Sequence, residues 1–369
     1  MSWRELQLGD VIRLKRGHDL PASARIAGEV PIVSSSGITG FHNVAKATGP
    51  GVVTGRYGTL GEIHYIEGDY WPLNTALYVE DFKGSHPRFV AYLLKTLDLG
   101  SQNAAGAVPG VNRNTLHQLS VRIPNVETQV AIAETLKQYD DLIENNRHRI
   151  ALLEESARLL YREWFVKLRF PGHELVKVVD GLPDGWILQS LSVVADFING
   201  FAFKPTHLQN TGLPVMKIPE LRDGVSAKTP RNSGELVPKR NKIDTGDLLF
   251  SWSATLLVNE WSEGPALLNQ HLFKVVPNLV FFKRFLRLAL AEAIPVLLGQ
   301  SVGATMQHIR KSALDSHKIL VPDEYIRQQF SEMADSIMDQ VIVLQLQNKL
   351  LAEARDSLLP KLMSGQLAT

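Results

Sequence analysis

The sequence predicts an α+β protein in which two homologous mixed α/β domains are separated by two long helices that form an antiparallel coiled coil. Three observations lead to this prediction: the chain repeats itself, a seven-residue apolar pattern occurs twice, and short strand-like segments alternate with glycine and proline. The chain has 369 residues, a length sufficient for two or three domains. Hydrophobic residues make up 44% and charged residues 21%, which is typical of a folded globular protein.

The internal repeat is visible when residues 3–35 are aligned with residues 186–218. In that alignment Trp3, Leu8, Val11, Gly17 and Pro31 fall on Trp186, Leu191, Val194, Gly200 and Pro214. Further matches follow in the same order: Leu73-Asn74 fall on Leu268-Asn269, and Ile123-Pro124 fall on Val321-Pro322. The offset between the copies grows along the chain, as it does when the second copy carries loop insertions. The unbroken order argues against chance similarity and predicts a tandem duplication.

Each copy is divided in the same way into a globular domain and a long helix. The predicted domains are 1–125 and 186–322, the helical segments are 126–170 and 323–369, and the linker is 171–185. Short apolar runs such as Gly51–Thr54 and Asp247–Phe250 predict strands that are broken by turns. A helical patch is expected within each domain, near 87–98 and 281–298.

The seven-residue pattern identifies the long helices. Apolar residues recur at alternating steps of four and three from Ile132 to Trp164, and again from Phe330 to Leu362. The predicted seam of the coiled coil includes Leu136, Ile143, Asn146, Ile150, Leu153, Leu344, Asn348, Leu351 and Leu358. A sustained repeat of seven indicates a coiled coil. Each run of 33 residues predicts a helix about 50 Å long, at roughly 1.5 Å per residue.

The two helices are expected to pair with each other, because a helix of this length is not stable in water with its apolar seam uncovered. If a rotation relates the two halves, the helices run antiparallel. Leu136 then lies opposite Leu358, Ile150 opposite Leu344, and Asn146 opposite Asn348. The two asparagines either hydrogen-bond to each other and fix the register, or each tolerates a wet edge of the seam. The sequence leaves both alternatives open.

Sequence motifs of catalysis are absent from the chain. There is no phosphate-binding loop of the GxxxxGKS/T type, no HExxH zinc motif and no GxSxG nucleophile turn. The chain has no cysteine, which excludes disulfides, a thiol nucleophile and cysteine-ligated metals. The glycine-rich segment 55–61 lies between two strand-like runs, so it is not expected to bind a dinucleotide. The chain is therefore predicted not to be an enzyme by itself and to hold no cofactor; the alternative is an unrecognised hydrolase.

Positive charge is concentrated in the globular domains, although the formal net charge of the whole chain is only +1. The first domain has a net charge of +2 and the second +5, whereas the helical segments and the linker are negative. This partition favours domains that touch phosphate and a spacer that does not. The candidate DNA contacts are Lys15, Arg16, Arg56, Tyr57, Lys217, Arg222, Arg231, Lys239, Arg240 and Trp252. For any one of them, a solvated surface group is the simpler explanation.

Several local segments resemble the specificity subunit of type I restriction–modification systems. They are Gly51–Gly61, Tyr70–Thr75, Gly106–Arg113 and Ile123–Pro124, with a degenerate second copy in Gly303–Thr305 and Val321–Pro322. The resemblance also rests on the duplication and the two heptad helices, and it covers nearly the whole chain. Each segment is moderately specific, whereas the order of all of them is highly specific.

The resemblance implies two target-recognition domains, each of which reads one half of a bipartite, asymmetric site on double-stranded DNA. The two helices then act as a spacer that sets the gap between the halves. They also dock two modification subunits, which bind S-adenosylmethionine and methylate adenine. In a restriction complex, restriction subunits that use ATP and Mg²⁺ join the assembly. The family fixes no base-contacting positions, so the candidate DNA contacts rest on charge and loop context alone.

Two other interpretations remain. A coiled-coil scaffold that binds only proteins would keep its behaviour toward nucleic acid when Arg56, Lys239 and Arg240 are changed to alanine. A specificity module of a related phage-defence methylase would differ in its partner but not in its mechanism. The chain is expected to be cytoplasmic and to have no membrane partner. It lacks a signal-peptide core, and no stretch approaches about 18–20 consecutive apolar residues.

Overall fold

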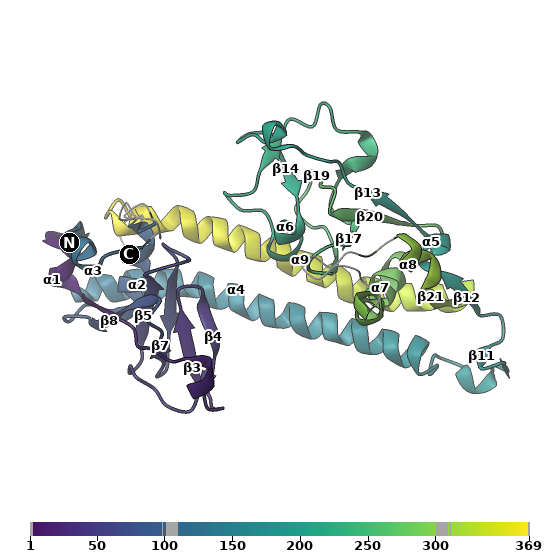
Figure 1. Ribbon diagram of the computed structural model, residues 1–369, viewed down its shortest axis with the longest axis horizontal. Helices are drawn as coiled ribbons and strands as arrows, with labels where there is room; N and C mark the ends of the chain where they lie inside the picture. Colours follow the sequence, from purple (N-terminus) through teal and green to yellow (C-terminus); the bar gives the residue numbers. More distant parts are fainter. Residues whose placement is uncertain (1–2, 98, 101–109, 300–308, 310, 368–369) are drawn as a thin grey trace. The chain divides into compact units, whose positions relative to one another are not determined.

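The computed structural model describes residues 3–97, 99–100, 110–299, 309 and 311–367; the segments 106–109 and 303–305 used in the sequence comparison lie outside the described residues. The chain forms two compact units. The first comprises Met1–Glu144 and Leu350–Thr369, and the second comprises Asn145–Lys349. Each unit contains one globular domain and a segment of each long helix (Figure 1).

The elements of the first half follow one another in a fixed order up to the first long helix. They are β1 (Arg4–Gln7), α1 (Leu8–Val11), β2 (Arg13–Arg16), a 3₁₀ turn (Ala22–Ala24), β3 (Val30–Ser34), β4 (Gly37–His42), β5 (Gly51–Gly55), β6 (Ile63–Ile66), β7 (Trp71–Pro72), β8 (Ala76–Asp81), α2 (Pro87–Thr96), α3 (Arg113–His117), β9 (Ser120–Ile123) and α4 (Val126–Tyr161).

The second half begins with the elements of the linker and then repeats this order with a few additional elements. Its elements are a π-helical turn (Arg162–Val166), a 3₁₀ turn (His173–Leu175), β10 (Val178–Val179), β11 (Leu182–Pro183), β12 (Ile187–Ser190), α5 (Leu191–Val194), β13 (Ala195–Asn199), a 3₁₀ turn (Pro205–His207), β14 (Leu213–Met216), α6 (Ile218–Asp223), β15 (Arg231–Asn232), a 3₁₀ turn (Lys239–Asn241), β16 (Lys242–Ile243), β17 (Leu248–Ser251), β18 (Val258–Glu260), β19 (Ala266–Leu268), β20 (Leu272–Pro277), α7 (Lys283–Gly299), α8 (Lys311–Ser316), β21 (Lys318–Val321) and α9 (Glu324–Met363).

The larger sheets of the two globular domains have matching topology, and the smaller sheets match except for an additional strand, β16, in the second domain. In the first domain the strand orders are β2-β8-β5-β6 and β4-β3-β7, and in the second they are β13-β20-β17-β18 and β15-β14-β19-β16. In each smaller sheet one pair is parallel, β3 with β7 and β14 with β19. A separate antiparallel pair, β1–β9 or β12–β21, joins the start of each domain to the strand before its long helix. The tandem duplication and the mixed α/β domains are therefore confirmed.

The central strand of each larger sheet is apolar on both faces because both faces are covered. On β5, Val52 packs with the residues of α2, whereas Val53 packs with Val33 and Tyr70. On β17, Leu248 and Leu249 divide in the same way between the large core of the second unit and a smaller cluster. This explains why these strands appear in the sequence as continuous apolar runs without alternation.

Two glycines mark corresponding points in the two copies. A Cβ atom on Gly17 would lie 2.1 Å from the backbone oxygen of Leu73, and one on Gly200 would lie 2.1 Å from that of Asn269. Both glycines thus allow a close backbone approach that no other residue permits. The same contacts correct the alignment, because Leu73 is equivalent to Asn269 and not to Leu268. The offset between equivalent positions of the two copies is therefore one residue larger here than the sequence alignment gives.

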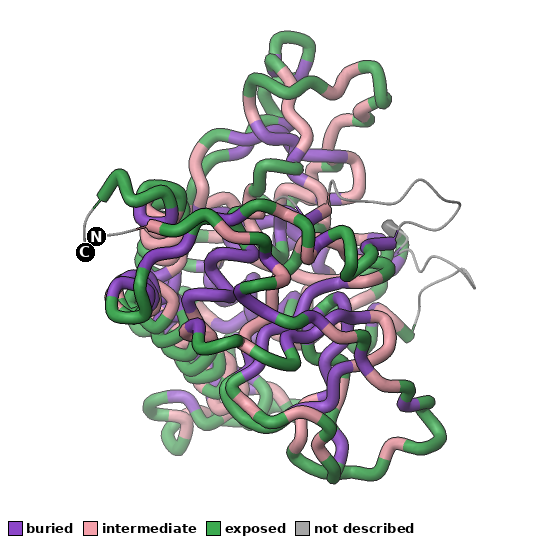
Figure 2. The backbone as a smooth tube through the Cα atoms, turned by 90° about the vertical axis from the view of Figure 1, so that its left-hand side faces the viewer, coloured by how far each residue is buried: buried purple, intermediate pink, exposed green. Residues whose placement is uncertain are grey.

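Within each unit the segments of α4 and α9 pack against each other in the predicted antiparallel register. In the first unit Leu136 and Leu358 belong to one apolar cluster. In the second, the ring centroids of Trp164 and Phe330, which face each other in that register, are 5.7 Å apart. The buried backbone lies in the sheets and on the covered faces of the helices, and the connecting turns are exposed (Figure 2).

All predicted seam residues are buried or half-buried. Leu136, Ile143, Asn146 and Leu344 are buried, and Ile150, Leu153, Asn348, Leu351 and Leu358 are half-buried. Among the described residues, the Oδ1 atom of Asn348 has no hydrogen-bond partner. The structure therefore gives no support to a hydrogen bond accepted by Asn348 from Asn146, and because this oxygen and Asn146 are both buried it gives none to a wet edge either.

The first long helix ends earlier than the sequence pattern predicts. α4 stops at Tyr161, and the next turn is π-helical before the chain turns away at Leu168, which has a φ of +56°. The wider turn directs Trp164 and Phe165 into the core, where both are buried. Residues 167–170 therefore lie beyond the helix. No helix in the described part of the chain is long and apolar enough to span a membrane.

We expect Gly17→Ala and Gly200→Ala each to destabilise their own unit by about 1–3 kcal/mol, because the added Cβ atom would overlap a backbone oxygen. Thermal unfolding followed by calorimetry measures the change. Gly68→Ala is the matched control, since no atom lies within 4 Å of its Cβ position. Equal melting temperatures for Gly17→Ala and Gly68→Ala would contradict this account of the repeat.

Candidate nucleic-acid interface

The basic residues predicted on β2 are already paired with carboxylates. Lys15 Nζ lies 2.5 Å from Oε1 of Glu80, and Arg13 Nη2 lies 2.8 Å from Oε2 of the same residue. The hydrogen bond to Glu80 raises the pKa of Lys15 and in turn lowers the pKa of Glu80. Arg16 lies 3.7 Å from Asp19. Lys15 and Arg16 therefore contribute little net positive charge to this edge of the sheet.

Arg56 and Tyr57 follow β5 on a loop whose backbone is held from both sides. Both backbone N–H groups donate to the carbonyl oxygen of Thr75, at 2.9 and 3.1 Å, and the carbonyl of Arg56 accepts from Val111 at 3.0 Å. The Arg56 guanidinium lies 4.5 Å from the centroid of the Tyr57 ring, which is 38% exposed. The loop therefore displays a stacked cation–aromatic pair on a fixed backbone.

The turn between β3 and β4 lies beside this loop and was missed by the sequence reasoning. A Cβ atom on Gly58 would lie 3.4 Å from Oγ of Ser35, and Nε2 of His64 lies 3.3 Å from the carbonyl oxygen of Ser35. Ser36 is exposed at the tip of the turn. The run of three serines before Gly37 was the available signal, since short polar side chains before glycine are typical of turns.

Trp252 occupies the place of Arg56 in the second domain. Its backbone N–H donates to His271 at 3.4 Å and its carbonyl accepts from Ile309 at 2.9 Å, which reproduces the contacts of Arg56 with Thr75 and Val111. Its indole N–H donates to the carbonyl of Gln270 at 3.0 Å, and its ring packs near His271 and is half-buried. Trp252 and Arg56 are thus both half-buried, whereas Tyr57 beside Arg56 is exposed in the first domain.

Three of the basic residues predicted in the second domain are engaged locally. Lys217 precedes α6, and its backbone N–H donates to Oε2 of Glu220 at 3.1 Å. Arg222 is paired with Asp223, with Nη2 2.7 Å from Oδ2. Arg231 donates from Nη1 to the carbonyl of Gly212 at 2.9 Å. The contacts of Arg222 and Arg231 hold their side chains in place, and at Arg222 the contact also offsets the charge. The hydrogen bond at Lys217 engages only its backbone.

Lys239 and Arg240 differ from these because both are exposed on a single 3₁₀ turn and no ion pair joins them to a described residue. Lys204, Lys228 and Lys242 are also exposed in the same domain and share this lack of an ion pair with any residue that the structure describes. Unpaired exposed cations are the groups best able to release counterions from a phosphate backbone. The structure therefore separates the sequence candidates into free and engaged groups.

His18 belongs to the packing of the first domain rather than to its charged surface. Its ring lies 6.4 Å from that of Trp71 and 6.0 Å from that of Tyr78. Burial lowers the pKa of His18, so the imidazole is neutral at pH 7. Lys46 lies 5.4 Å from the Trp71 ring centroid and is a cation that the sequence reasoning did not select.

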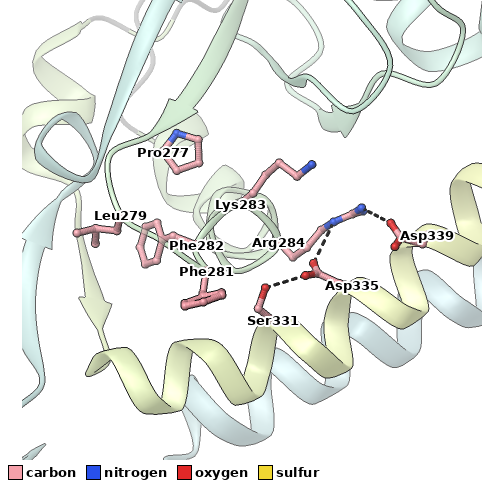
Figure 3. A pocket seen from close by; sticks show the side chains of 9 residues that line it. All are labelled: Pro277, Leu279, Phe281, Phe282, Lys283, Arg284, Ser331, Asp335 and Asp339. Carbon is pink, nitrogen blue, oxygen red and sulfur yellow. Dashed lines mark hydrogen bonds and ion pairs between the residues drawn. The ribbon is translucent and has the colours of Figure 1, made fainter.

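A pocket of about 490 Å³ lies in the second unit beside α7 and α9. It is lined by Pro277, Leu279, Phe281, Phe282, Lys283, Arg284, Ser331, Asp335 and Asp339. Figure 3 shows Arg284 pointing toward Asp335 and Asp339, and Ser331 toward Asp335. Its polar groups bind one another, as in a contact between helices. In the described part of the chain, no group of three or more metal-binding side chains is close enough to hold an ion.

Known proteins are similar to this chain in sequence or in fold. The type I restriction enzyme MjaIX specificity subunit of Methanocaldococcus jannaschii is 25% identical over 297 residues, which cover 76% of this chain and 68% of the relative. The HindI specificity subunit of Haemophilus influenzae is 22% identical over 337 residues, covering 72% and 73%. The crystal structure of a type I restriction–modification S subunit from M. genitalium has a similar fold, with a TM-score of 0.59 at 14% identity over 98% of this chain and 96% of that one.

The sequence profile of the type I restriction modification DNA specificity domain matches residues 1–155 and 183–354, which include both globular domains and most of both long helices. The match repeats along the chain, as the duplicated fold requires. The curated relatives are named as specificity subunits, a role without catalysis, which confirms the sequence prediction for this chain. The chain therefore belongs to the type I restriction–modification DNA specificity family and is a non-catalytic specificity subunit.

Proposed function

We propose that this chain reads a bipartite, asymmetric site on double-stranded DNA, with one recognition domain on each half of the site. The observation that carries the proposal is that the same fold occurs twice with different exposed groups at equivalent points. A guanidinium stacked on the exposed Tyr57 ring is displayed in the first domain, where the second domain has the half-buried indole of Trp252. Two similar backbones with different surfaces suit two different half-sites, and linking them raises the affinity of the pair.

The free cations are our candidates for phosphate contacts, and the stacked pair is our candidate for base contacts. Lys239 and Arg240 are exposed and unpaired with any described residue. Arg56 combines a guanidinium, which suits the acceptor edge of guanine, with the neighbouring Tyr57 ring. Lys15, Arg16 and Arg222 rank lower because carboxylates already neutralise them. Arg231 and Trp252 rank lower because local hydrogen bonds hold their side chains. Lys217 ranks lower because it is only partly exposed.

We expect Lys239→Ala/Arg240→Ala to weaken DNA binding and to reduce the slope of log K against log salt by about two, because two phosphate contacts are lost. Fluorescence anisotropy with a duplex carrying the target site, measured over a range of salt, gives both quantities. Arg222→Ala is the matched control, because its charge is already paired with Asp223. Equal effects of the two variants would contradict this ranking. No effect on DNA from either variant, or from Arg56→Ala, would favour the protein-binding scaffold.

The paired long helices are proposed to set the gap between the two half-sites. α4 and α9 span Val126–Tyr161 and Glu324–Met363, and their seams are covered within each unit. Covered helices resist bending, so a distance fixed along them is retained. Successive major-groove faces on one side of B-DNA recur about every 34–36 Å, a separation that helices about 50 Å long can bridge.

We expect insertion of one heptad after Arg147 and a second after Gln347, at opposite points of the two helices, to lengthen the gap by about three base pairs. Seven residues add about 10 Å to a helix, and each base pair adds about 3.4 Å. Mapping methylated adenines in DNA from cells that carry the variant and its modification subunit measures the gap. An unchanged gap would refute the spacer proposal. Replacing only the first recognition domain should change one half of the motif.

We infer that the outer faces of the long helices dock the modification subunits. Leu152 and Leu159 on α4, and Val343 and Leu350 on α9, each directly precede a seam residue, and all four are at least half exposed. Leu152 and Leu350 occupy the same position of the two copies. Exposed leucines at heptad spacing are costly in water unless a partner covers them. Equivalent positions in both copies suit two copies of one partner.

The cofactors of the assembled complex are proposed to belong to these partners. S-adenosylmethionine would bind to the modification subunits, and ATP with Mg²⁺ to restriction subunits when these are present. The chain itself is proposed to contribute the DNA site and the docking faces.

We expect Leu152→Glu and Leu350→Glu each to remove one copy of the modification subunit from the complex, and the double variant to remove both. A buried carboxylate without a partner strongly disfavours an interface. Light scattering coupled to size-exclusion chromatography measures the mass of the complex. Leu236→Glu is the control, because Leu236 is 88% exposed and lies outside the helices. Two bound copies in every variant would rule out this docking face.

A further inference from the structure

We propose that each recognition domain is fixed to both long helices by a polar link that starts from a buried side chain of the domain, and that Tyr92 and Arg284 are the positioning residues of these two links. The first link joins α2 to α4 and α9 through Asp140 and Arg355, and the second joins α7 to the same two helices through Asp339 and Glu154. The inference rests on the proposed reading of a bipartite site, and it adds the residues that hold each domain at its angle to the spacer.

The first link is a chain of three side chains in the first unit. The hydroxyl of Tyr92, which is buried on α2, donates to Oδ2 of Asp140 on α4. The other oxygen of Asp140 accepts from Nη1 of Arg355 on α9 at 2.6 Å. Burial alone would raise the pKa of Asp140, but the hydrogen bonds from Tyr92 and Arg355 hold that pKa below its usual value. The carboxylate is therefore charged at neutral pH and connects the domain to both helices at once.

The same contact explains a charged residue in the apolar seam. Arg355 occupies a seam position of α9, where an unpaired guanidinium would be costly. It is half-buried, and its guanidinium lies between Asp140 and Asp356. The seam position thus serves the link to α2 as well as the pairing of the helices.

The second link uses two arginines on α7 in the second unit, of which Figure 3 shows Arg284. Arg284 is 5% exposed; its Nη2 donates to Oδ1 of Asp339 at 2.6 Å, and its Nε lies 3.4 Å from Asp335, both on α9. Arg287 is also buried and donates from Nη2 to Glu154 on α4 at 2.7 Å. α7 therefore reaches α9 through one arginine and α4 through the other.

Arg284 is itself held in place from within the domain. Its Nη1 lies 2.7 Å from Oε1 of Glu260 on β18, and Lys283 lies 3.5 Å from the other oxygen of Glu260. The guanidinium thus forms an ion pair with Glu260 of the sheet, without hydrogen-bond geometry at Nη1, and donates a hydrogen bond from Nη2 to α9. Such paired, directional contacts fix an angle, whereas apolar packing alone allows small rotations.

The equivalent arginine of the first domain, Arg88, is used differently. It stacks over Tyr65 on β6 at 4.1 Å and bonds to Glu67 at 2.9 Å, so its contacts stay within the domain. Tyr65 lies opposite Val52 on β5 as Glu260 lies opposite Leu248 on β17. The two copies therefore fix their domains with different side chains, and the two links can be weakened separately.

We therefore expect the residues that contact bases to be distinct from the residues that fix the gap between the half-sites. Neither link includes any of the candidate DNA contacts. Weakening a link should leave the base preference of each half-site intact and should widen the range of gaps that the chain accepts. A residue that supports only folding would not produce that combination.

The test uses the full chain with its modification subunit in cells, and compares Tyr92→Phe and Asp339→Asn with the unaltered chain. Tyr92→Phe removes one hydroxyl, and Asp339→Asn removes the negative charge that Arg284 contacts on α9 and so weakens this link, while leaving Arg284 paired with Glu260 and Asp335. Mapping methylated adenines gives the ratio of methylation at sites with the native gap to that at sites one base pair longer or shorter. We expect each variant to lower this ratio by about five- to tenfold, the effect of one lost hydrogen bond, with unchanged half-site bases.

Glu332→Gln is the matched control, because it neutralises a carboxylate of α9 that bonds only to Gln328 of the same helix among the described contacts. If the variants kept the ratio of this control, or changed the half-site bases, or lost methylation at every gap length, the inference would be wrong. If the complex of the unaltered chain with its modification subunit methylated a single uninterrupted site, the proposed reading of a bipartite site would fail instead. The two failures are therefore distinguishable.

Discussion

A helix of 36 residues with an apolar seam cannot remain uncovered in water, and in each unit α4 covers its seam with α9. This pairing constrains much of the rest of the molecule. It requires two helices of similar length, one from each copy, and it makes them antiparallel within each unit. Because each globular domain packs onto this pair, the helix surfaces also determine where the domains can be held.

The two domains share their fold because a few positions require the same residue or the same backbone contacts in both. They differ in the side chains that the loops display. Gly17 and Gly200 both permit a backbone contact that a Cβ atom would block. The loop backbones at Arg56 and Trp252 make the same hydrogen bonds although their side chains differ entirely. A fixed backbone with variable side chains allows two domains of one origin to recognise different sequences.

The buried arginines Arg284 and Arg287 lie where the second domain meets the long helices. Arg284, Arg287 and Asp140 are buried or half-buried and each has a charged or hydroxyl partner on a different element. Removing charge from water is costly, so such groups persist where direction matters more than simple burial. Lys239 and Arg240 show the opposite behaviour, exposed and unpaired with described residues, as suits groups that meet phosphate.

The sequence by itself determined the duplication, the seven-residue seams, the antiparallel pairing and the short apolar strands, because each leaves a local or periodic pattern of residue types. Leu136 could be placed in the seam and Val52 in a strand from spacing and neighbours alone. Only the tertiary structure decided which cations are free, since Lys15 and Glu80 are 65 positions apart in the chain. The same is true of Arg355 and Asp140, separated by 215 positions. Pairing between distant side chains depends on how elements pack in space, and no repeat in the sequence records it.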